Sequence, residues 1–417
     1  MTTRPRLTPA IADVRRAVRE SLAGLLPDAA VAAADSGSPE AAGSPDVAVS
    51  SVRRFVINAE DVGAALMTNR RIDGAKADAS AALAADASAA DAAVADVLVA
   101  LSGGADSLAL AAATAFEAPR AGGGTGLRAG AVIVDHGLQA GSAGVAERAA
   151  AQARELGLHP VLVERVAVGT EGGPEAAARD ARYAAFAEAA SGTGAGAVLL
   201  GHTLDDQAET VLLGLARGSG TASLSGMAPV SVASSSEAEG GASVTYLRPL
   251  LGIRCAQTLQ FCKDSGLEPW QDPQNVDPKF ARVRVRERVL PVLEAELGPG
   301  IAEALARTAE QAREDAEALD HFAEEQAEEL ADHAEAGLSL SVKGLASNPA
   351  ALRQRIIRLA VAAEFGVSLS RAQTLEVARL VTDWHGQGVL HLPGVRVVRQ
   401  GALIVFSAVE DGGRARG

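Results

Sequence analysis

Apolar positions in this chain repeat with two different spacings. Residues 8–26 place Ile11, Val14, Val18 and Leu22 three or four positions apart, which is the pattern of one face of an amphipathic helix. From residue 94 onward, short apolar runs alternate with segments of helical spacing. In chain order, these strands and helices are expected at 94–101, 107–116, 129–134, 144–156, 160–166, 175–190, 197–200 and 205–217. Strands and helices that alternate in this way predict an α/β fold with a doubly wound parallel sheet.

The pattern in the rest of the chain is less regular. We expect a loop over 231–243, an amphipathic helix over 255–265, and a long acidic helix over 301–335 that serves as a connector. Residues 345–409 predict two helices followed by short strands at 389–392, 395–399 and 403–406. This combination indicates a small α+β domain at the C-terminal end.

Residues 27–93 differ in composition from both regions. They are rich in Ala, Asp, Ser and Gly and carry few large apolar side chains, so they cannot bury enough apolar area to fold alone. We expect residues 28–93 to be a poorly ordered insertion with one richer island at 51–71. The expected organisation is an N-terminal helix plus insertion (1–93), an α/β domain (94–245), a helical and partly basic connector (246–336) and a small C-terminal domain (337–417).

Composition and charge narrow the class of protein. The 417 residues are 48% hydrophobic, largely through alanine, and carry a formal net charge of −14. Such an acidic balance argues against indiscriminate binding to nucleic acid or anionic membranes, so any RNA contact must come from a local basic patch. The N-terminus lacks the apolar core of a signal peptide, and no apolar run reaches the ~20 residues that cross a bilayer. We expect a soluble, cytoplasmic protein.

The two cysteines, Cys255 and Cys262, lie seven positions apart. Two thiols cannot complete a four-ligand zinc site, and this spacing is not the CxxC pattern of redox or cluster motifs. We therefore expect unpaired thiols in a reducing compartment.

The first candidate site is the turn between the strand at 94–101 and the helix that follows it. The turn consists of Ser102, Gly103, Gly104, Ala105, Asp106 and Ser107. Glycines let the backbone approach a ligand, and the free N–H groups at the start of a helix favour phosphate. No lysine follows the glycines, so this is not the GxxxxGK[ST] phosphate loop. A plain glycine turn between a core strand and a core helix is the alternative.

Two further polar motifs follow predicted strands. Asp135-His136 comes after the second strand, and residues 201–210 come after the fourth. Because ligands bind outside the carboxyl ends of parallel strands, we expect all three motifs to line one crevice. Asp206 and Glu209 share one face of the last helix near its positive end. Helix capping with a solvated acidic face is the alternative there, and a strand-end cap is the alternative for Asp135-His136.

Basic side chains gather in two segments. Arg179 and Arg182 share a helical face with Phe186. Residues 279–290 hold five basic side chains against the single acid Glu287, and the five are Lys279, Arg282, Arg284, Arg286 and Arg288. In so acidic a chain, the second segment is a candidate contact for the phosphate backbone of RNA. A solvated helix face is the alternative in both segments.

Together these motifs resemble a known family. SGGADS resembles the pyrophosphate loop (PP-loop) of the ATP pyrophosphatases, which split ATP between its α and β phosphates. With VDHGL, AARDARY, GHTLDDQAETVLLGLARGSG, LSGM, RPLLGI and DPQNVDPKFARVRVRERVLP, the chain closely resembles the tRNA(Ile)-lysidine synthetase family in the family's own order over 94–292. DWHGQGVLHLPG resembles the family's C-terminal domain. The insertion at 28–93 and the short C-terminal part depart from the family pattern.

The resemblance implies an ATP-dependent ligase with an adenine nucleotide alpha hydrolase-like fold. Members of the family adenylate the wobble cytidine of a CAU-anticodon isoleucine tRNA and then attach lysine at C2, with release of pyrophosphate and AMP. The implied cofactors and partners are ATP, Mg²⁺, L-lysine and tRNA(Ile), with the 337–417 domain contacting tRNA. No membrane partner is implied, and a homodimer is left open.

The resemblance also implies roles for individual residues. The phosphate-binding loop corresponds to Ser102, Gly103, Gly104, Ala105, Asp106 and Ser107, with Asp106 facing Mg²⁺. Asp135, His136 and Arg179 correspond to nucleotide-binding positions. Arg182, His202, Asp206 and Glu209, together with Asp106, correspond to catalytic positions. Since free lysine is protonated at neutral pH, a carboxylate must hold its ammonium and accept a proton. Asp206 and Glu209 are the candidates, and the choice between them stays open.

Two other functions fit part of the pattern. A tRNA cytidine thiolase shares the loop but is expected to carry CxxC-type cysteines, which this chain lacks. A non-catalytic RNA-binding relative would keep the fold and lose turnover. The intact Ser102, Asp106, Asp206 and Glu209 argue against that second alternative.

Overall fold

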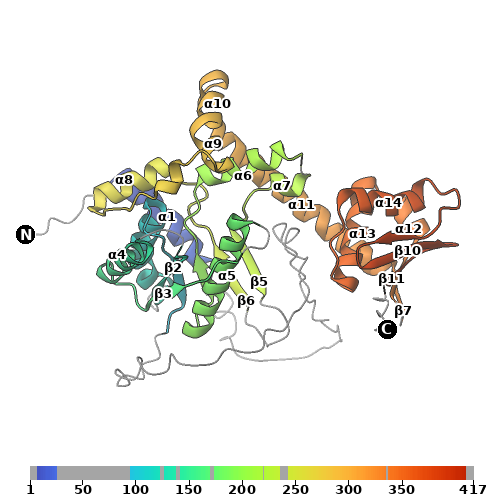
Figure 1. Ribbon diagram of the computed structural model, residues 1–417, viewed down its shortest axis with the longest axis horizontal. Helices are drawn as coiled ribbons and strands as arrows, with labels where there is room; N and C mark the ends of the chain where they lie inside the picture. Colours follow the sequence, from blue (N-terminus) through green and yellow to red (C-terminus); the bar gives the residue numbers. More distant parts are fainter. Residues whose placement is uncertain are drawn as a thin grey trace, which may run out of the picture. The chain divides into compact units, whose positions relative to one another are not determined.

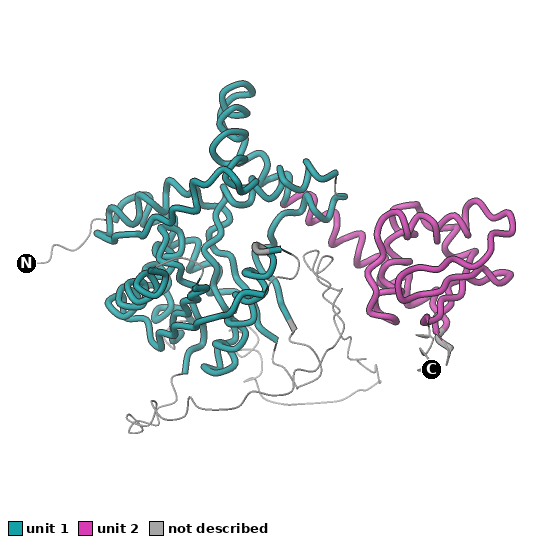
Figure 2. The backbone as a smooth tube through the Cα atoms, in the orientation of Figure 1, with its two compact units in different colours: residues 1–56, 75–309 teal, residues 57–74, 310–417 magenta. Residues whose placement is uncertain are grey.

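The computed structural model describes residues 7–25, 94–122, 126–137, 141–169, 173–218, 220–234, 243–334 and 337–409. The chain divides into two compact units, and among the described residues the first ends at Ala309 and the second begins at Glu310 (Figure 2). The prediction for 28–93 lies outside the described residues. In the described part of the chain, no helix is long and apolar enough to cross a membrane.

A six-stranded sheet organises the first unit (Figure 1). Its strands are β1 (Val97–Ala100), β2 (Ala129–Asp135), β3 (Val161–Arg165), β4 (Ala197–Leu199), β5 (Val230–Ser234) and β6 (Ser243–Leu247). They lie in the order β3-β2-β1-β4-β6-β5, and all are parallel except the edge strand β5. Val97 of β1 pairs with Ala129 on one side and Ala197 on the other, so the carboxyl end of β1 lies between those of β2 and β4.

Helices cover both faces of this sheet, which confirms the predicted doubly wound fold. α1 (Pro9–Ala23), α3 (Ala105–Glu117), α4 (Ser142–Glu155) and α8 (Cys255–Ser265) share one core with the strands. α5 (Pro174–Thr193) packs on the other face through Phe186 and Ala189. Successive residues of β1 alternate between these cores, with Val97 and Val99 in the first and Leu98 in the second.

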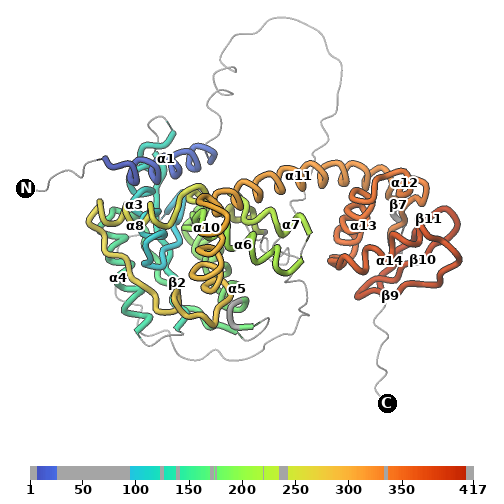
Figure 3. The backbone as a smooth tube through the Cα atoms, turned by 90° about the horizontal axis from the view of Figure 1, so that it is seen from above, coloured from blue at the N-terminus to red at the C-terminus, as the bar shows by residue number. Residues whose placement is uncertain are grey.

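The predicted N-terminal helix is α1, which lies beside α3 and α8 (Figure 3). Thr8 caps its N-terminus and Pro9 occupies its first position, an arrangement that favours helix initiation. Arg15 and Arg19 flank the apolar stripe, and their Nε atoms lie 2.6 and 2.8 Å from the carboxylate of buried Glu117 in α3. Apolar burial and charge pairing together therefore fix α1 on the sheet domain.

The remainder of the first unit is helical. It contains α6 (Leu204–Ala216), α7 (Thr221–Leu224), α9 (Ala281–Arg284) and α10 (Leu290–Leu297), with 3-10 turns at Ala118–Arg120 (η2) and Pro273–Val276 (η5). A π-helical turn, η6 (Val285–Val289), separates α9 from α10. The basic segment at 279–290 is therefore a broken helix. α11 (Ile301–Leu330) begins in the first unit and ends in the second.

The second unit is the small α+β domain that the sequence predicts. Its strands are β7 (Ala331–Ala334), β8 (Gly337–Ser341), β9 (Leu390–Leu392), β10 (Val395–Gln400) and β11 (Leu403–Ala408), in the antiparallel order β7-β8-β11-β10-β9. Its helices are α12 (Val342–Ser347), α13 (Ala350–Phe365) and α14 (Arg371–Thr382). Leu340, Ile356 and Phe406 are fully buried in the core between sheet and helices.

Two sequence expectations about these regions are wrong. Residues 231–243 were expected to form a loop, but 230–234 form β5, which pairs antiparallel with β6. The helix expected over 301–335 ends at Leu330, and residues 331–334 form β7, paired with β8. Neither segment has a strong local preference for a strand. Each forms one because a partner strand is present, and pairing with it overrides the weak local propensity.

Candidate active site

The turn between β1 and α3 is shaped to receive an anion. Gly103 has a φ of 83°, a conformation that favours glycine. The Ser107 hydroxyl accepts a hydrogen bond from the Ser102 N–H at 3.2 Å and lies 3.0 Å from the Ser102 hydroxyl, so the two serines brace the turn. Gly104 at the N-cap provides no side-chain cap for α3. The first N–H groups of α3 are therefore left for a ligand.

A cavity of about 1550 Å³ lies at the carboxyl ends of the strands. Its lining includes most of the predicted site residues: Ser102, Gly104, Ala105, Asp106, Ser107, Asp135, His136, Arg179, Arg182, His202 and Glu209. Gly103 lines a smaller hollow that shares Trp270 with the cavity. Asp206 lies behind this surface, in contact with residues that line it. The structure thus brings the three strand-end motifs to one place.

Asp106, in the first turn of α3, is held in a protected position. The Thr258 hydroxyl of α8 donates a hydrogen bond to one of its oxygens, and Cys255 Sγ lies 3.9 Å from the other. Burial raises the pKa of Asp106 to about 6, and the negative charges of Asp206 and Asp205 add to the effect. The site therefore favours either a proton or a cation on this carboxylate.

Asp206 caps α6, as the structural alternative proposed. One of its oxygens accepts hydrogen bonds from the Thr203 N–H at 2.8 Å and the Thr203 hydroxyl at 2.9 Å, and the Asp206 N–H in turn bonds the Thr203 hydroxyl in a capping box. Its other oxygen lies 3.2 Å from Arg286 Nη2. Asp206 therefore both caps α6 and places a charged group beside Glu209.

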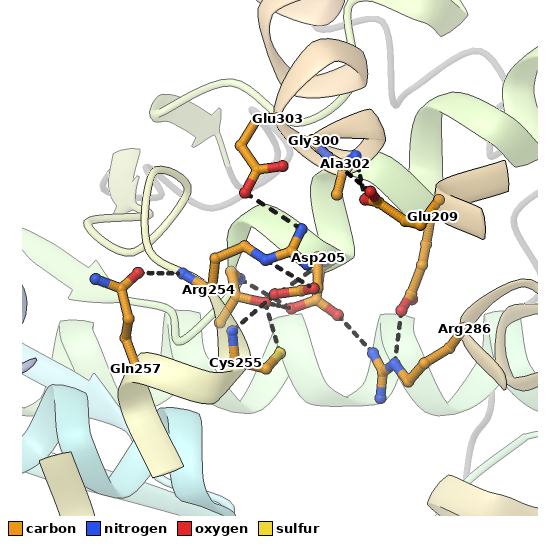
Figure 4. A network of polar contacts seen from close by, with 12 residues as sticks. Asp205, Glu209, Arg254, Cys255, Gln257, Arg286, Gly300, Ala302 and Glu303 are labelled. Carbon is orange, nitrogen blue, oxygen red and sulfur yellow. Dashed lines mark hydrogen bonds and ion pairs between the residues drawn. The ribbon is translucent and has the colours of Figure 1, made fainter. Parts of the chain in front are cut away.

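Glu209, one turn further along α6, does not belong to a solvated acidic face, because its side chain is fully buried. Its Oε1 accepts a hydrogen bond from Arg286 Nε at 2.6 Å (Figure 4). Its Oε2 makes no hydrogen bond with the described residues. Burial raises the pKa of Glu209 to about 7, an effect that Arg286 opposes and Asp206 reinforces. A half-paired carboxylate near its titration point therefore faces the cavity.

The basic segment at 279–290 does not present all its arginines to solvent. Arg282 and Arg286 turn toward α6, where they pair with Asp206 and Glu209. Arg284 donates hydrogen bonds to the carbonyls of Pro278 and Lys279 at 2.8 Å each. Arg288 is exposed. Arg282 and Arg286 therefore serve as partners of the α6 carboxylates, and the RNA contact expected of this segment stays a prediction.

The remaining predicted residues surround the same cavity from β2, α5 and the end of β4. Hydrogen bonds from Ser142 and Gly137 hold the pKa of Asp135 below its usual value, so it does act as a strand-end cap. Burial, and then the charge of Arg182, lower the pKa of His136. Burial also lowers the pKa of His202 to about 4. Both histidines are therefore neutral at neutral pH.

Five buried polar atoms on residues that line the cavity make no hydrogen bond with the described residues. They are His136 Nδ1, Tyr183 Oη, His202 Nδ1, Glu209 Oε2 and Arg254 Nη1. Two of them have a longer charge contact, Glu209 Oε2 with Arg282 at 3.8 Å and Arg254 Nη1 with Glu303 at 3.7 Å. Buried polar groups in folded proteins are normally paired. Walls whose buried donors and acceptors lack hydrogen bonds indicate a cavity suited to a polar ligand.

Sequence reasoning missed several residues of this site. Arg254, Cys255 and Trp270 line the cavity, and Thr258 binds Asp106. The backbone N–H of Trp270 donates to the Gly103 carbonyl at 2.9 Å, which ties the irregular segment at 268–275 to the turn at 102–107. A tryptophan inside a polar, turn-rich segment was the one local signal that this segment packs against the rest of the domain. Cys255 and Cys262 are free thiols.

Comparisons with known proteins agree with this geometry. Residues 78–293 match the family model described as a PP-loop domain, and residues 340–403 match the model described as a TilS substrate binding domain. The tRNA(Ile)-lysidine synthase of Leifsonia xyli subsp. xyli is 65% identical over 310 residues, which cover 74% of this chain and 89% of that protein. Proteins of the same name from Streptomyces coelicolor and Thermobifida fusca are 53% and 51% identical, each over 74% of this chain and over 84% and 90% of their own lengths.

Proposed function

The chain belongs to the tRNA(Ile)-lysidine synthase family, and we propose that it is an ATP-dependent ligase that joins L-lysine to C2 of the wobble cytidine in tRNA(Ile) with a CAU anticodon. The reaction has two steps. Cytosine O2 attacks the α phosphate of ATP, which adenylates the base and releases pyrophosphate. The lysine ε-amine then attacks C2, and AMP leaves with the oxygen.

One observation carries the proposal at the level of the site. A single cavity joins an anion-binding turn, Ser102–Ser107, to the buried carboxylate Glu209. The turn suits phosphate, and a buried carboxylate suits a lysine ammonium, which is costly to bury unpaired. Because both substrates must reach the same base, a shared cavity supplies the proximity that the two steps require.

For adenylation, we assign phosphate binding to the turn at 102–107 and nucleotide binding to Asp135, His136 and Arg179. Asp106 is suited to bind Mg²⁺, because a cation would offset the cost of burying its negative charge near Asp205 and Asp206. Within the described residues, no three His, Cys, Asp or Glu side chains form a metal site. Phosphate oxygens would therefore provide much of the coordination, which is usual for this ion, and bound Mg²⁺ would stabilise the charge on the departing pyrophosphate. We assign Arg182 and His202 to stabilising the negative charge that develops during adenylation, with His202 acting as a neutral hydrogen-bond donor.

For lysine transfer, we assign the general base to Glu209. Asp206 accepts hydrogen bonds from Thr203 on one oxygen and from Arg286 on the other, whereas Glu209 keeps Oε2 free of hydrogen bonds among the described residues. A pKa of about 7 lets Glu209 bind the ammonium as a carboxylate and then accept its proton. Asp206 contributes a second negative charge at the lysine site.

The second unit is the proposed tRNA anchor. Residues 337–409 hold eight Lys and Arg against three Asp and Glu, in a chain whose total charge is −14. Trp384 is 40% exposed, and the guanidinium carbon of Arg399 lies 5.0 Å from its ring centre. Arg399 is itself fixed by hydrogen bonds to the carbonyls of Leu380 and Gly401. A braced, exposed tryptophan in basic surroundings suits stacking on an unpaired base.

Replacing Trp384 with alanine is expected to weaken tRNA binding about tenfold, because a stacked base contributes roughly 1–3 kcal/mol. Fluorescence anisotropy with labelled tRNA at fixed salt measures this change. Phe322→Ala is the matched control, since Phe322 is 53% exposed in the same unit and outside the basic group. Equal affinities for the Trp384 variant and the wild type would contradict the stacking role.

Replacing Arg288 with glutamate is expected to weaken tRNA binding and lower the slope of log affinity against log salt by about one to two units. Arg288 is the appropriate target because Arg284 is engaged with backbone carbonyls. Exposed Arg307 of α11, changed in the same way, controls for the general effect of charge. An unchanged salt slope in the Arg288 variant would identify this face as merely solvated.

The direct test of function uses labelled lysine, ATP and CAU-anticodon tRNA(Ile). Incorporation into this tRNA is expected, with one pyrophosphate and one AMP released per lysine. A tRNA with uridine at the wobble position should accept none, because it presents a different base at the reacting position. Pyrophosphate release that never leads to lysine incorporation would point to a different modification, and no release at all would point to a binding protein.

A further inference from the structure

Arg286 lies between the two carboxylates of α6 and contacts both. Its Nε is 2.6 Å from Glu209 Oε1, and its Nη2 is 3.2 Å from Asp206 Oδ1. A guanidinium is planar and presents its N–H groups in a fixed fork, so two such contacts set the angle between the carboxylates as well as their separation. A lysine at this position has one point charge and cannot impose that angle.

The arginine is held in place by packing. Val285, the first residue of its π-helical turn, and Leu290, the residue after the turn, are buried in one cluster. The cluster also contains Leu204 and Ala208 of α6 and Ala302 of α11. The turn itself breaks the helix between α9 and α10, and such π turns are frequent at functional sites. Arg286 is therefore fixed against α6, unlike a surface ion pair whose partners move freely.

The Arg286 guanidinium binds Oε1 of Glu209 and does not bind Oε2. Oε2 is buried, makes no hydrogen bond with the described residues, and belongs to a side chain that lines the cavity. Arg282 Nε lies 3.8 Å from it, beyond hydrogen-bonding distance. We propose that Arg286 is a positioning residue, which orients Glu209 so that Oε2 receives the lysine ammonium and takes its proton. This inference rests on the proposed function.

The charges around Glu209 support this arrangement. Arg286 and Arg282 face it from the segment at 281–289, Asp206 faces it from its own helix, and neutral His202 lines the same cavity. Without Arg286, burial and Asp206 would act on Glu209 with only Arg282 in opposition, and the carboxyl would take up a proton at higher pH. Protonated Glu209 can neither attract an ammonium nor accept its proton. Arg286 thus keeps the Glu209 carboxylate both correctly oriented and ionised.

The test compares Arg286→Gln, Arg286→Lys and the control Arg307→Gln in the full-length enzyme with tRNA and ATP. Arg286→Gln is expected to raise the KM for lysine at least about tenfold. It should also move the acid limb of kcat/KM for lysine to higher pH, while tRNA-dependent pyrophosphate release changes less than about threefold. Arg286→Lys should restore the pH limb, because it restores the charge, but only part of the KM, because it lacks the fork. Arg307→Gln should match the wild type.

An independent readout is the titration of Glu209 followed by carbon-13 NMR in the resting enzyme. Its midpoint is expected to rise in Arg286→Gln and to return toward the wild-type value in Arg286→Lys. An unshifted midpoint, or a normal lysine KM in Arg286→Gln, would overturn the inference while the wild type still made lysidine. A wild-type enzyme that incorporates no lysine would instead reject the proposed function. If Arg286→Gln fails to fold, the same criteria apply to Arg286→Lys, whose lysine KM must rise while its pH limb stays.

Discussion

Replacing Asp106 with asparagine is expected to reduce tRNA-dependent pyrophosphate release by at least about a hundred- to a thousandfold. The carboxylate sits in the first turn of α3 beside the phosphate-binding turn, where we assign it to Mg²⁺, and loss of one group that stabilises transition-state charge commonly has an effect of this size. Asparagine keeps the shape and can still accept the Thr258 hydrogen bond. A pyrophosphate assay with ATP and tRNA measures the loss, and near-normal release would remove Asp106 from the first step.

The stability of the same variant provides the control. The pKa of Asp106 is raised from 3.8 to about 6 by burial, so the folded state holds the proton more tightly than the unfolded chain does. Stability is therefore lost as the pH rises from about 4 to about 6, by up to about 3 kcal/mol. Asparagine does not titrate, so the metal-free variant should melt at or above the wild-type temperature at about pH 8. A much lower melting temperature would mean that inactivity reflects unfolding.

Glu209→Gln is expected to separate the two steps of the reaction. Glutamine can neither neutralise the lysine ammonium nor accept its proton, so lysine incorporation should fall by at least about a hundredfold. Pyrophosphate release should persist, because adenylation precedes lysine attack, and adenylated tRNA should accumulate. Parallel assays of labelled lysine and of pyrophosphate test this. Equal losses in both assays would place Glu209 in the first step instead.

Asp206→Asn is the informative companion to that variant. Asp206 caps α6 through Thr203, so its replacement is expected to lower stability by up to about 1 kcal/mol as well as to raise the lysine KM. The effect on lysine transfer should be smaller than for Glu209→Gln, since Glu209 Oε2 makes no hydrogen bond with the described residues and is the oxygen assigned to the ammonium. A larger effect at Asp206 would reverse the assignment of the base.

The local sequence pattern was sufficient to predict the parallel sheet, the turn at 102–107 and the meeting of the three strand-end motifs. Alternation between apolar strands and helical segments depends on burial within each element, and parallel strands connected in that order have few possible arrangements. The phosphate-binding turn is equally local, because Gly103 needs its positive φ and Ser102 lies only five positions from Ser107. The strand-end motifs then meet at one edge of the sheet, because the parallel topology alone places the carboxyl ends of the strands there. Weak strands such as β5 and β7 were missed because their formation depends on a partner.

The burial and the partners of the candidate catalytic groups were decided by contacts between distant segments. Arg286 reaches Glu209 across 77 positions, and Thr258 reaches Asp106 across 152. A charged residue in a sequence gives no sign of whether it will be solvated or buried, and burial changes its protonation and its partner. For the acidic face of α6 and for the basic segment at 279–290, a solvated surface remained an alternative when each was taken alone. Packed together, they bury Glu209 and bring Arg282 and Arg286 to its carboxylate, because buried opposite charges are stabilised only when they meet. Glu209 Oε2 is left without a hydrogen bond among the described residues.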